Sequence, residues 1–256
     1  MGLTDDIIIE VKNLSKSFGG VKALDDVNIA FEKNMITGLI GPNGAGKTTL
    51  FNIISGIYKP DCGEVKFKNM NIEKLPAHKI SQLGIGRLFQ DIRIFRKLTA
   101  LENVLVAFPN QVGEKFYEPI IKRNKFLKSE KNNIQKAEEL LDFVGLKDYK
   151  NTLAENLSYG QQKLLSIARL LALDAEVLLL DEPASGIHPY FIEKICNLIK
   201  DLLKMGKTVI FTEHNMNVVL EIADWVYLLN EGKVIAFGLP QEVLEDKITK
   251  EVYLGV

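Results

Sequence analysis

A glycine-rich loop set between an apolar run and a helix-like segment constrains the fold of this chain more than any other feature. The loop, Gly41–Thr48, reads Gly-Pro-Asn-Gly-Ala-Gly-Lys-Thr and follows the apolar run Ile36–Ile40. The segment Thr48–Ile54 after it has helical character. A strand, loop and helix in this order gather backbone N–H groups and the positive end of a helix around one anion. The sequence therefore predicts an α/β fold with a phosphate site at the loop.

Individual residues of the glycine-rich loop suit different parts of a phosphate chain. Gly41, Gly44 and Gly46 let the backbone bend so that successive N–H groups converge on the β- and γ-phosphates. Lys47 adds a full positive charge, and Thr48 offers a hydroxyl to Mg²⁺, which prefers oxygen ligands. A glycine-rich turn with an exposed lysine is the alternative interpretation. The match of every fixed position, in the required context, favours phosphate binding.

Two carboxylates follow a second apolar run. Val177–Leu180 leads directly into Asp181 and Glu182. Such a run is typical of a buried parallel strand, and ligands bind at the carboxyl edge of parallel sheets. We expect Asp181 to hold the magnesium shell and Glu182 to act as general base or to position the attacking water. A solvated acidic turn is the alternative.

Three other polar residues stand next to predicted elements. Gln90 and His214 each follow a strand candidate, and an imidazole at a strand end can hydrogen-bond a γ-phosphate. Ser158 precedes a long helix that begins near Gln161, which provides a hydroxyl and free N–H groups at a helix start. On its own, Ser158 is an ordinary helix cap, and Gln90 an exposed polar residue.

Together these motifs resemble the ATP-binding subunit of ABC transporters over almost the whole chain. The family's pattern assigns the Q-loop to Gln90, the signature to Leu157–Gln161, the Walker B end to Asp181 and Glu182, the D-loop to Ala184–Pro189 and the switch histidine to His214. The resemblance implies an ATPase that uses ATP with Mg²⁺. Its fold would be a P-loop ATPase core with a mainly parallel sheet, an antiparallel β layer and a helical subdomain.

The resemblance also implies a nucleotide shared between two subunits. The signature of one subunit, with Ser158 and Gly160, would cover the γ-phosphate held by the other. Phe18 matches the aromatic residue that stacks on adenine. Tyr159 stands where the family often has Gly, and His188 replaces the Asn or Asp common in the D-loop. The substitution at His188 leaves the details of coupling across the dimer open.

The candidate site residues fall into three groups. The catalytic candidates are Glu182, His214 and Gln90. The metal-binding candidates are Thr48, Gln90 and Asp181. The nucleotide-binding candidates are Phe18, Gly41, Pro42, Asn43, Gly44, Ala45, Gly46, Lys47, Thr48, Thr49, Ser158, Gly160 and Gln161.

We expect a single ABC nucleotide-binding domain over residues 1–256. Its ATP-binding core, with the β layer, would comprise 1–90 and 157–240, its helical subdomain 91–156 and its C-terminal tail 241–256.

The expected antiparallel strands are Ile7–Val11, Val27–Phe31 and Val65–Lys68, and the expected parallel strands are Ile36–Ile40, Ile85–Phe89, Val177–Asp181, Val209–Thr212 and Val226–Leu229. The expected helices include Leu101–Ala107, Ile134–Val144, Gln161–Ala172 and Phe191–Met205, and the polar stretch Lys122–Asn133 is expected to be a solvated helix face or loop.

Composition argues against several other classes of protein. The 256 residues, of which 46% are hydrophobic, suffice for a large α/β domain. With 32 basic and 33 acidic residues, the chain offers no broadly basic surface for nucleic acid. Cys62 and Cys196 fit no disulfide or metal framework, which favours a reduced cytosolic setting. The N-terminus lacks a secretory signal, and no apolar segment approaches the roughly 18 residues of a membrane span.

Local sequences narrow the resemblance. Arg87–Gln90, Thr212–Met216, Val252–Gly255 and the Leu-Ser-Tyr-Gly-Gln-Gln signature resemble those of the ATP-binding subunits of branched-chain amino acid importers. The ATPases of lipopolysaccharide export share much of this pattern, and no catalytic residue distinguishes the two. A soluble ABC ATPase acting on ribosomes usually carries two cassettes, and a DNA-organising one needs a long coiled coil that this sequence lacks.

The resemblance implies partners as well. They are two transmembrane permease subunits, a second copy of the chain or a related ATPase subunit, and indirectly an extracytoplasmic substrate-binding protein, with no nucleic acid. The chain would lie at the cytoplasmic face of the cell membrane, with its groove around Asp91–Ala107 docked to the permeases. The transported solute and the direction of transport stay open at this point.

Overall fold

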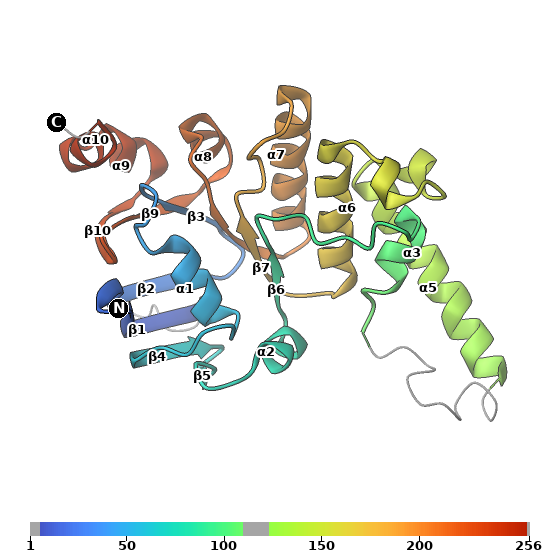
Figure 1. Ribbon diagram of the computed structural model, residues 1–256, viewed down its shortest axis with the longest axis horizontal. Helices are drawn as coiled ribbons and strands as arrows, with labels where there is room; N and C mark the ends of the chain where they lie inside the picture. The colour runs from blue at the N-terminus through green and yellow to red at the C-terminus, as the bar shows by residue number, and fades with distance from the viewer. Residues whose placement is uncertain (1–5, 110–122, 255–256) are drawn as a thin grey trace. The chain divides into compact units, whose positions relative to one another are not determined.

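The computed structural model describes residues 6–109 and 123–254 of the chain. The chain forms two compact units. The first unit comprises Met1–Gln90 and Ala175–Val256, and the second comprises Asp91–Asp174. Figure 1 labels the helices and strands of both units.

The first unit contains a six-stranded, mostly parallel sheet. Its order is β10-β9-β3-β8-β7-β6, in which β10 pairs antiparallel with β9 and the other pairs are parallel. The bounds are β3 (Ile36–Ile40), β6 (Ile85–Leu88), β7 (Val177–Asp181), β8 (Thr208–Thr212), β9 (Trp225–Asn230) and β10 (Lys233–Gly238). Every residue of β3, β7 and β8 is buried, because both faces of the sheet are covered.

A second, antiparallel sheet of the same unit has the order β2-β1-β4-β5. Its strands are β1 (Ile7–Phe18), β2 (Val21–Glu32), β4 (Cys62–Phe67) and β5 (Met70–Asn71). Gly19 and Gly20, both with positive φ, form the tight turn between β1 and β2. This layer and the parallel sheet confirm the predicted fold class. The strands β1 and β2 are longer than the predicted segments, and their pairing is interrupted by register shifts.

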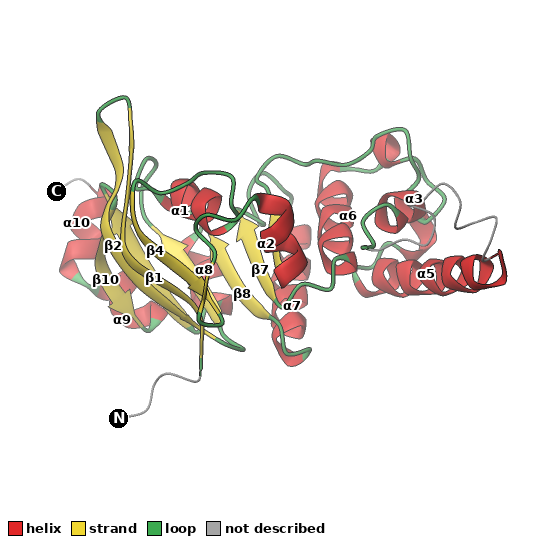
Figure 2. Ribbon diagram, turned by 90° about the horizontal axis from the view of Figure 1, so that it is seen from below, coloured by secondary structure: helices red, strands yellow, loops and turns green. Residues whose placement is uncertain are grey.

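Helix α1 (Lys47–Ile54) provides the core shared by the two sheets. Leu50, Phe51, Ile53 and Ile54 of this helix are fully buried in one cluster with apolar residues of both sheets. The packing fixes the start of α1, and with it the end of the glycine-rich loop, against strands from both layers (Figure 2).

Other helices of the first unit pack around this frame. Helix α7 (Pro189–Lys204) contacts β8 and α8 (Met216–Ile222). It buries Ile195, Leu198, Ile199 and Leu202, which follow the spacing of one helix face. The remaining helices are α2 (Ala77–Leu83), α9 (Pro240–Glu245) and α10 (Lys247–Leu254). The last two lie in the predicted C-terminal tail, 241–256, except for Pro240 at the start of α9.

The second unit is helical in the part that the structure describes. It contains α3 (Ala100–Leu105), α5 (Arg123–Phe143), the short 3₁₀ turns Lys147–Tyr149 and Ala154–Asn156, and α6 (Tyr159–Ala172). Lys122, the first residue of the predicted polar stretch, lies outside the described residues, and the rest of that stretch belongs to α5. Side-chain caps fix two helix starts: Thr99 and Glu102 form a capping box on α3, and Ser158 and Gln161 form one on α6.

Phe211 provides a test of the core of the first unit. It is fully buried in β8, and its ring packs against Gly38 of β3. Phe211→Ala should lower the free energy of unfolding by about 3–5 kcal/mol, because it leaves a cavity between strands. The matched change Phe237→Ala, in β10, where the side chain is 64% exposed, should cost about 1 kcal/mol or less. Urea unfolding followed by circular dichroism measures both, and equal losses would contradict this account of the core.

Candidate nucleotide-binding and catalytic site

The glycine-rich loop leaves β3 and enters α1 through two glycines that no other residue can replace. Gly41 has a φ of 142°, and a Cβ atom there would lie 2.1 Å from the carbonyl oxygen of Leu229. Gly46 has a φ of 105°, and its Cβ would lie 2.5 Å from the carbonyl oxygen of Ala23. Side chains are therefore excluded at both positions by backbone conformation and by space. The tight path of the loop follows from these two residues.

Lys47 is the first residue of α1 and is almost fully buried. Its Nζ donates hydrogen bonds to the carbonyl oxygens of Gly41, at 2.7 Å, and Pro42, at 2.9 Å. Burial lowers the pKa of the Lys47 ammonium, while the carboxylates of Glu182 and Asp181 act in the opposite direction. The Lys47 side chain thus folds back onto the backbone of the loop that precedes it.

A polar pocket of about 380 Å³ opens beside the loop. It brings together the loop and several candidates that are far apart in the sequence. The lining residues are Ala23, Asn43, Gly44, Ala45, Gly46, Lys47, Thr48, Thr49, Gln90, Glu182 and His214. All three catalytic candidates therefore face one cavity together with residues 43–49 of the candidate nucleotide-binding loop.

Glu182 is the centre of the polar contacts in this pocket. Its Oε1 lies 2.9 Å from Nε2 of His214, and its Oε2 accepts a hydrogen bond of 2.9 Å from Nε2 of Gln90. The backbone of Glu182 has a φ of 48°, in the left-handed region that a residue with a side chain rarely adopts. Such a conformation costs about 1–3 kcal/mol and is found preferentially at functional sites. The backbone conformation that places this carboxylate therefore lowers the stability of the folded chain.

Asp181, the last residue of β7, is buried and held by two partners. Its Oδ2 lies 3.0 Å from the guanidinium of Arg87, and its Oδ1 accepts a hydrogen bond of 2.8 Å from the hydroxyl of Thr212. Both side chains of the ion pair are only 5% exposed. A buried carboxylate needs such a counter-charge, because an unpaired charge in the protein interior is very costly. The pair fixes the carboxylate at the edge of the sheet.

Two residues of β8 and its following turn hold the segment that carries the carboxylates. The backbone N–H of Glu182 donates to the carbonyl and to the hydroxyl oxygen of Thr212, each at 3.1 Å. The buried carboxylate of Glu213 accepts hydrogen bonds from the N–H groups of Ala184, at 2.7 Å, and His214, at 3.2 Å. Glu213 therefore joins the start of the predicted D-loop to the backbone of His214, whose imidazole lines the pocket.

The donors at this site suit Mg²⁺ bound with a nucleotide. Thr48 supplies a hydroxyl, Gln90 an amide oxygen and Asp181 a carboxylate, and Mg²⁺ prefers oxygen ligands while keeping several waters. Thr48 and Gln90 line the pocket directly, and the Arg87 contact keeps the Asp181 side chain oriented. The residues present therefore fit the predicted metal.

Seven candidates are not among the residues that line this pocket, and three of them, Gly41, Pro42 and Asp181, directly precede lining residues in the chain. Phe18, at the end of β1, is 42% exposed and packs edge-on against Tyr58; among the described residues it does not line the pocket. Ser158, Gly160 and Gln161 belong to the second unit, where Ser158 caps α6. Their predicted roles toward a nucleotide stay predictions.

The sequence interpretation missed several residues that support the site. In the sequence, Arg87, Thr212, Glu213 and Tyr253 stand only in strings typical of the family, and Thr212 also ends a predicted strand. Tyr253 accepts a hydrogen bond from the N–H of Gly41. Each acts on a partner that is distant in the chain, so no local pattern reveals its role. A buried arginine in a strand was the available signal at Arg87, because such a charge requires a partner.

His188 departs from the residue common at its position but keeps a capping role. It is the N-cap of α7, and its Nδ1 accepts a hydrogen bond of 3.3 Å from the N–H of Tyr190. Asn and Asp are strong N-caps for the same reason. The imidazole thus replaces the usual acceptor at this helix start.

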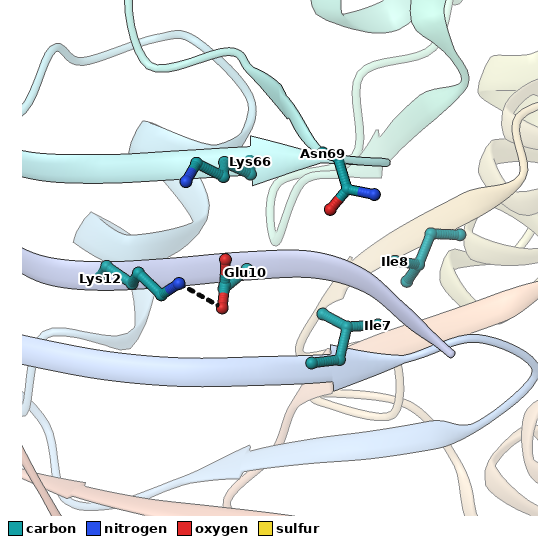
Figure 3. A pocket seen from close by; sticks show the side chains of 6 residues that line it. All are labelled: Ile7, Ile8, Glu10, Lys12, Lys66 and Asn69. Carbon is teal, nitrogen blue, oxygen red and sulfur yellow. Dashed lines mark ion pairs between the residues drawn. The ribbon is translucent and has the colours of Figure 1, made fainter. Parts of the chain in front are cut away.

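A second pocket, shown in Figure 3, has a different character. It has a volume of about 310 Å³ and is lined by Ile7, Ile8, Glu10, Lys12, Lys66 and Asn69. Lys12 is paired with Glu10 at 2.7 Å, and Lys66 with Glu64 at 3.1 Å. Its cations are thus already neutralised by neighbouring glutamates. The pocket beside the glycine-rich loop remains the candidate site.

Comparison with known proteins agrees with this geometry. The family model described as "ABC transporter" matches residues 24–185, which include the glycine-rich loop, Gln90, Asp181 and Glu182. This chain belongs to the ABC transporter family. The resemblance inferred from the sequence is thereby confirmed, and so is the classification as an ATPase.

Curated relatives of this ABC protein cover nearly the whole chain. The probable branched-chain amino acid transport ATP-binding protein LivG of Archaeoglobus fulgidus is 42% identical over 97% of this chain and 95% of its own length. The high-affinity branched-chain amino acid transport ATP-binding protein LivG of Escherichia coli is 36% identical, over 97% and 98%. The lipopolysaccharide export system ATP-binding protein LptB of Haemophilus influenzae is also 36% identical, over 97% of each chain.

Solved structures show the same fold. A nucleotide-free ATP-binding cassette from an ABC transporter matches with a TM-score of 0.85 and 34% identity, covering 98% of this chain and 100% of that one. A dimeric, post-hydrolysis state of an ATP-binding cassette bound to ADP and Pi matches with a TM-score of 0.76 and 28% identity, over 91% and 98%. Within residues 6–109 and 123–254, no helix combines the length and apolar character needed to cross a membrane.

The Arg87–Asp181 pair provides a test of how the site is held. Arg87→Met should lower the free energy of unfolding by about 3–5 kcal/mol, because it leaves a buried carboxylate without its counter-charge. The double variant Arg87→Met with Asp181→Asn should lose less than Arg87→Met alone, since the unpaired charge is then gone. Urea unfolding followed by the fluorescence of Trp225, the single tryptophan, measures both. An equal loss of unfolding free energy in the single and double variants would show that the unpaired carboxylate is not the cause of the destabilisation.

Proposed function

We propose that this ABC ATPase is the motor subunit of an importer for branched-chain amino acids. The observation that supports this most directly is the pocket in which Lys47, Gln90, Glu182 and His214 face one another beside the glycine-rich loop. Such an arrangement suits phosphoryl transfer from ATP to water, where positioning and electrostatic stabilisation supply most of the catalysis. The similarity to two LivG proteins supports the choice of solute.

In the proposed reaction the loop binds the phosphates and Glu182 acts on water. The N–H groups of the glycine-rich loop and the Lys47 ammonium hold the β- and γ-phosphates. Glu182 accepts a proton from the attacking water, or orients it, once the water takes the place of one of its partners. Thr48, Gln90 and Asp181 would hold Mg²⁺, which neutralises phosphate charge when it is bound.

Gln90 and His214 are proposed to report on the nucleotide. Both contact Glu182 in the structure, one at each carboxylate oxygen. Each can also hydrogen-bond a γ-phosphate, its metal or the water, so nucleotide binding would draw them away from Glu182 and release the base. Hydrolysis would let the contacts form again. The exchange of partners gives the site two arrangements that differ in the presence of the γ-phosphate.

Two chains are proposed to close around two ATP molecules. The signature residues Ser158, Gly160 and Gln161 would cover the γ-phosphate held by the partner's loop, with the start of α6 adding its partial positive charge. Phe18 would stack on adenine. The dimeric structure of a related cassette bound to ADP and Pi supports this proposal. The pair would consist of two copies of this chain or, as we prefer, of this chain and a related ATPase.

The proposed partners in the membrane are two permease subunits at the cytoplasmic face. The helical subdomain would receive the permeases in a groove around Asp91–Ala107 and move relative to the ATP-binding core. An extracytoplasmic binding protein would deliver the solute. A lipopolysaccharide-export ATPase is the second candidate, favoured by the 36% identity to LptB.

Glu182→Gln tests the proposed base. The variant should bind ATP with an affinity close to that of the wild type, because the amide keeps the shape of the side chain. Its ATP turnover should fall by roughly 10²-fold or more, since an amide cannot accept the proton. Steady-state phosphate release and equilibrium binding of ATP measure the two effects.

Glu231→Gln is the matched control for this experiment. Glu231 is exposed and shares the left-handed backbone conformation, with a φ of 47°. Its replacement should leave both turnover and binding unchanged. Turnover by Glu182→Gln at a near wild-type rate would remove Glu182 from the role of base.

Co-purification tests the transporter assignment. Tagged Glu182→Gln, isolated from native membranes with Mg-ATP, should bring two multi-span permeases, a second ATPase and a substrate-binding protein, identified by mass spectrometry. Recovery of components of a lipopolysaccharide exporter would favour the second candidate. Recovery of ribosomal or chromosomal proteins without a membrane partner would overturn the transporter assignment and leave only the ATPase chemistry.

A further inference from the structure

The last helix of the chain reaches the first residue of the glycine-rich loop. Tyr253 lies on α10, and its hydroxyl oxygen accepts a hydrogen bond of 2.6 Å from the backbone N–H of Gly41. The two residues are 212 positions apart in the sequence. The contact therefore joins the C-terminal helix to the loop by tertiary structure alone.

The surroundings of Tyr253 make its hydroxyl a stable acceptor. Burial raises the pKa of Tyr253 to about 12, against a smaller opposing effect of the hydrogen bond from Gly41. The phenol is therefore neutral at any physiological pH. A backbone N–H that loses its partner in the protein interior costs about as much as a lost hydrogen bond, so the contact constrains both residues.

Gly41 connects this contact to Lys47. Its N–H donates to Tyr253, and its carbonyl oxygen accepts a hydrogen bond from Lys47 Nζ at 2.7 Å. Gly41 also packs so closely on the carbonyl of Leu229 that no side chain fits there. Three contacts thus fix one glycine, and two of them lead directly to the C-terminal helix and to the candidate phosphate-binding lysine.

We propose that Tyr253 is a positioning residue for nucleotide binding, through which α10 holds the start of the glycine-rich loop in its binding conformation. The proposal rests on the function proposed above, in which this loop binds ATP. Holding the loop in advance reduces the conformational freedom that binding must remove, and pre-organisation of this kind raises affinity without a contact to the ligand. Tyr253 itself touches the loop and not the nucleotide.

Tyr253→Phe tests the proposal with the loss of one oxygen atom. The ring keeps the packing of α10, so the full-length variant should fold. We expect its Kd for ATP to rise about fivefold, the effect of one hydrogen bond of ordinary strength. The KM for ATP should rise by a similar factor while kcat changes little, because no group that acts on the γ-phosphate is altered. Equilibrium binding of ATP and steady-state kinetics measure these values.

Tyr227→Phe is a closely matched control. Tyr227, on β9, is buried, and its hydroxyl donates a hydrogen bond of 2.8 Å to the backbone carbonyl of Ala30. Both variants should lower Tm by about 2–4 °C, since each loses one partly buried hydrogen bond. Only Tyr253→Phe should change the Kd for ATP. Equal Kd values in the wild type and both variants would overturn the proposal and leave Tyr253 a residue that only stabilises α10.

Hydrogen exchange provides a second, reciprocal measurement. If α10 holds the loop, ATP bound to the loop must stabilise α10 by the same coupling free energy. ATP should therefore slow amide exchange in residues 247–254 of the wild type, and this protection should be reduced in Tyr253→Phe and kept in Tyr227→Phe. Equal protection by ATP in all three chains would also contradict the proposal.

Lys47→Ala separates failure of this inference from failure of the proposed function. If Lys47→Ala binds ATP as well as the wild type, the loop is not the nucleotide site and the proposed function fails. If Lys47→Ala loses binding while Tyr253→Phe retains wild-type affinity, only the role of Tyr253 is overturned.

Discussion

The ion pair between Arg87 and Asp181 joins segments that must meet before this chain can have a nucleotide site. Arg87 lies on β6 and Asp181 at the end of β7, and the same guanidinium donates to Asn52 of α1 and to Ser55, the C-cap residue of this helix. Strands of the parallel sheet and the helix that follows the glycine-rich loop are thus connected through one buried cation. Since neither charge is stable in the interior alone, the sheet, the helix and the carboxylate depend on one another.

Much of the architecture could be predicted from the sequence where residues bury both faces of a strand. β3 and β7 have the predicted bounds, because each is a continuous apolar run that ends at a glycine or a carboxylate. The predictions fell short at β1 and β2, whose outer residues are polar and follow irregular pairing, and at β10, a short antiparallel edge strand of half-buried residues that was not predicted.

In the candidate site, too, some residues could be predicted from the sequence and others could not. Local motifs predicted the residues that line the pocket, because the phosphate-binding loop and the strand-end carboxylates require fixed residue types at short spacing. Arg87, Glu213 and Tyr253 hold the neighbouring residues Asp181, Ala184 and Gly41 from 94, 29 and 212 positions away. No spacing rule connects such pairs, since the fold alone brings them together. The sequence therefore predicts which groups face a ligand better than it predicts which groups hold them.

The left-handed backbone at Glu182 has a consequence for how this position responds to selection. Glycine adopts a φ of 48° without a steric penalty, so a glycine here would relieve strain that every other residue type, including the natural glutamate, must bear. It would also remove the carboxylate. A search for thermally stable variants would thus tend to replace the very residue on which turnover is proposed to depend. At position 182, thermal stability and ATP turnover therefore favour different amino acids.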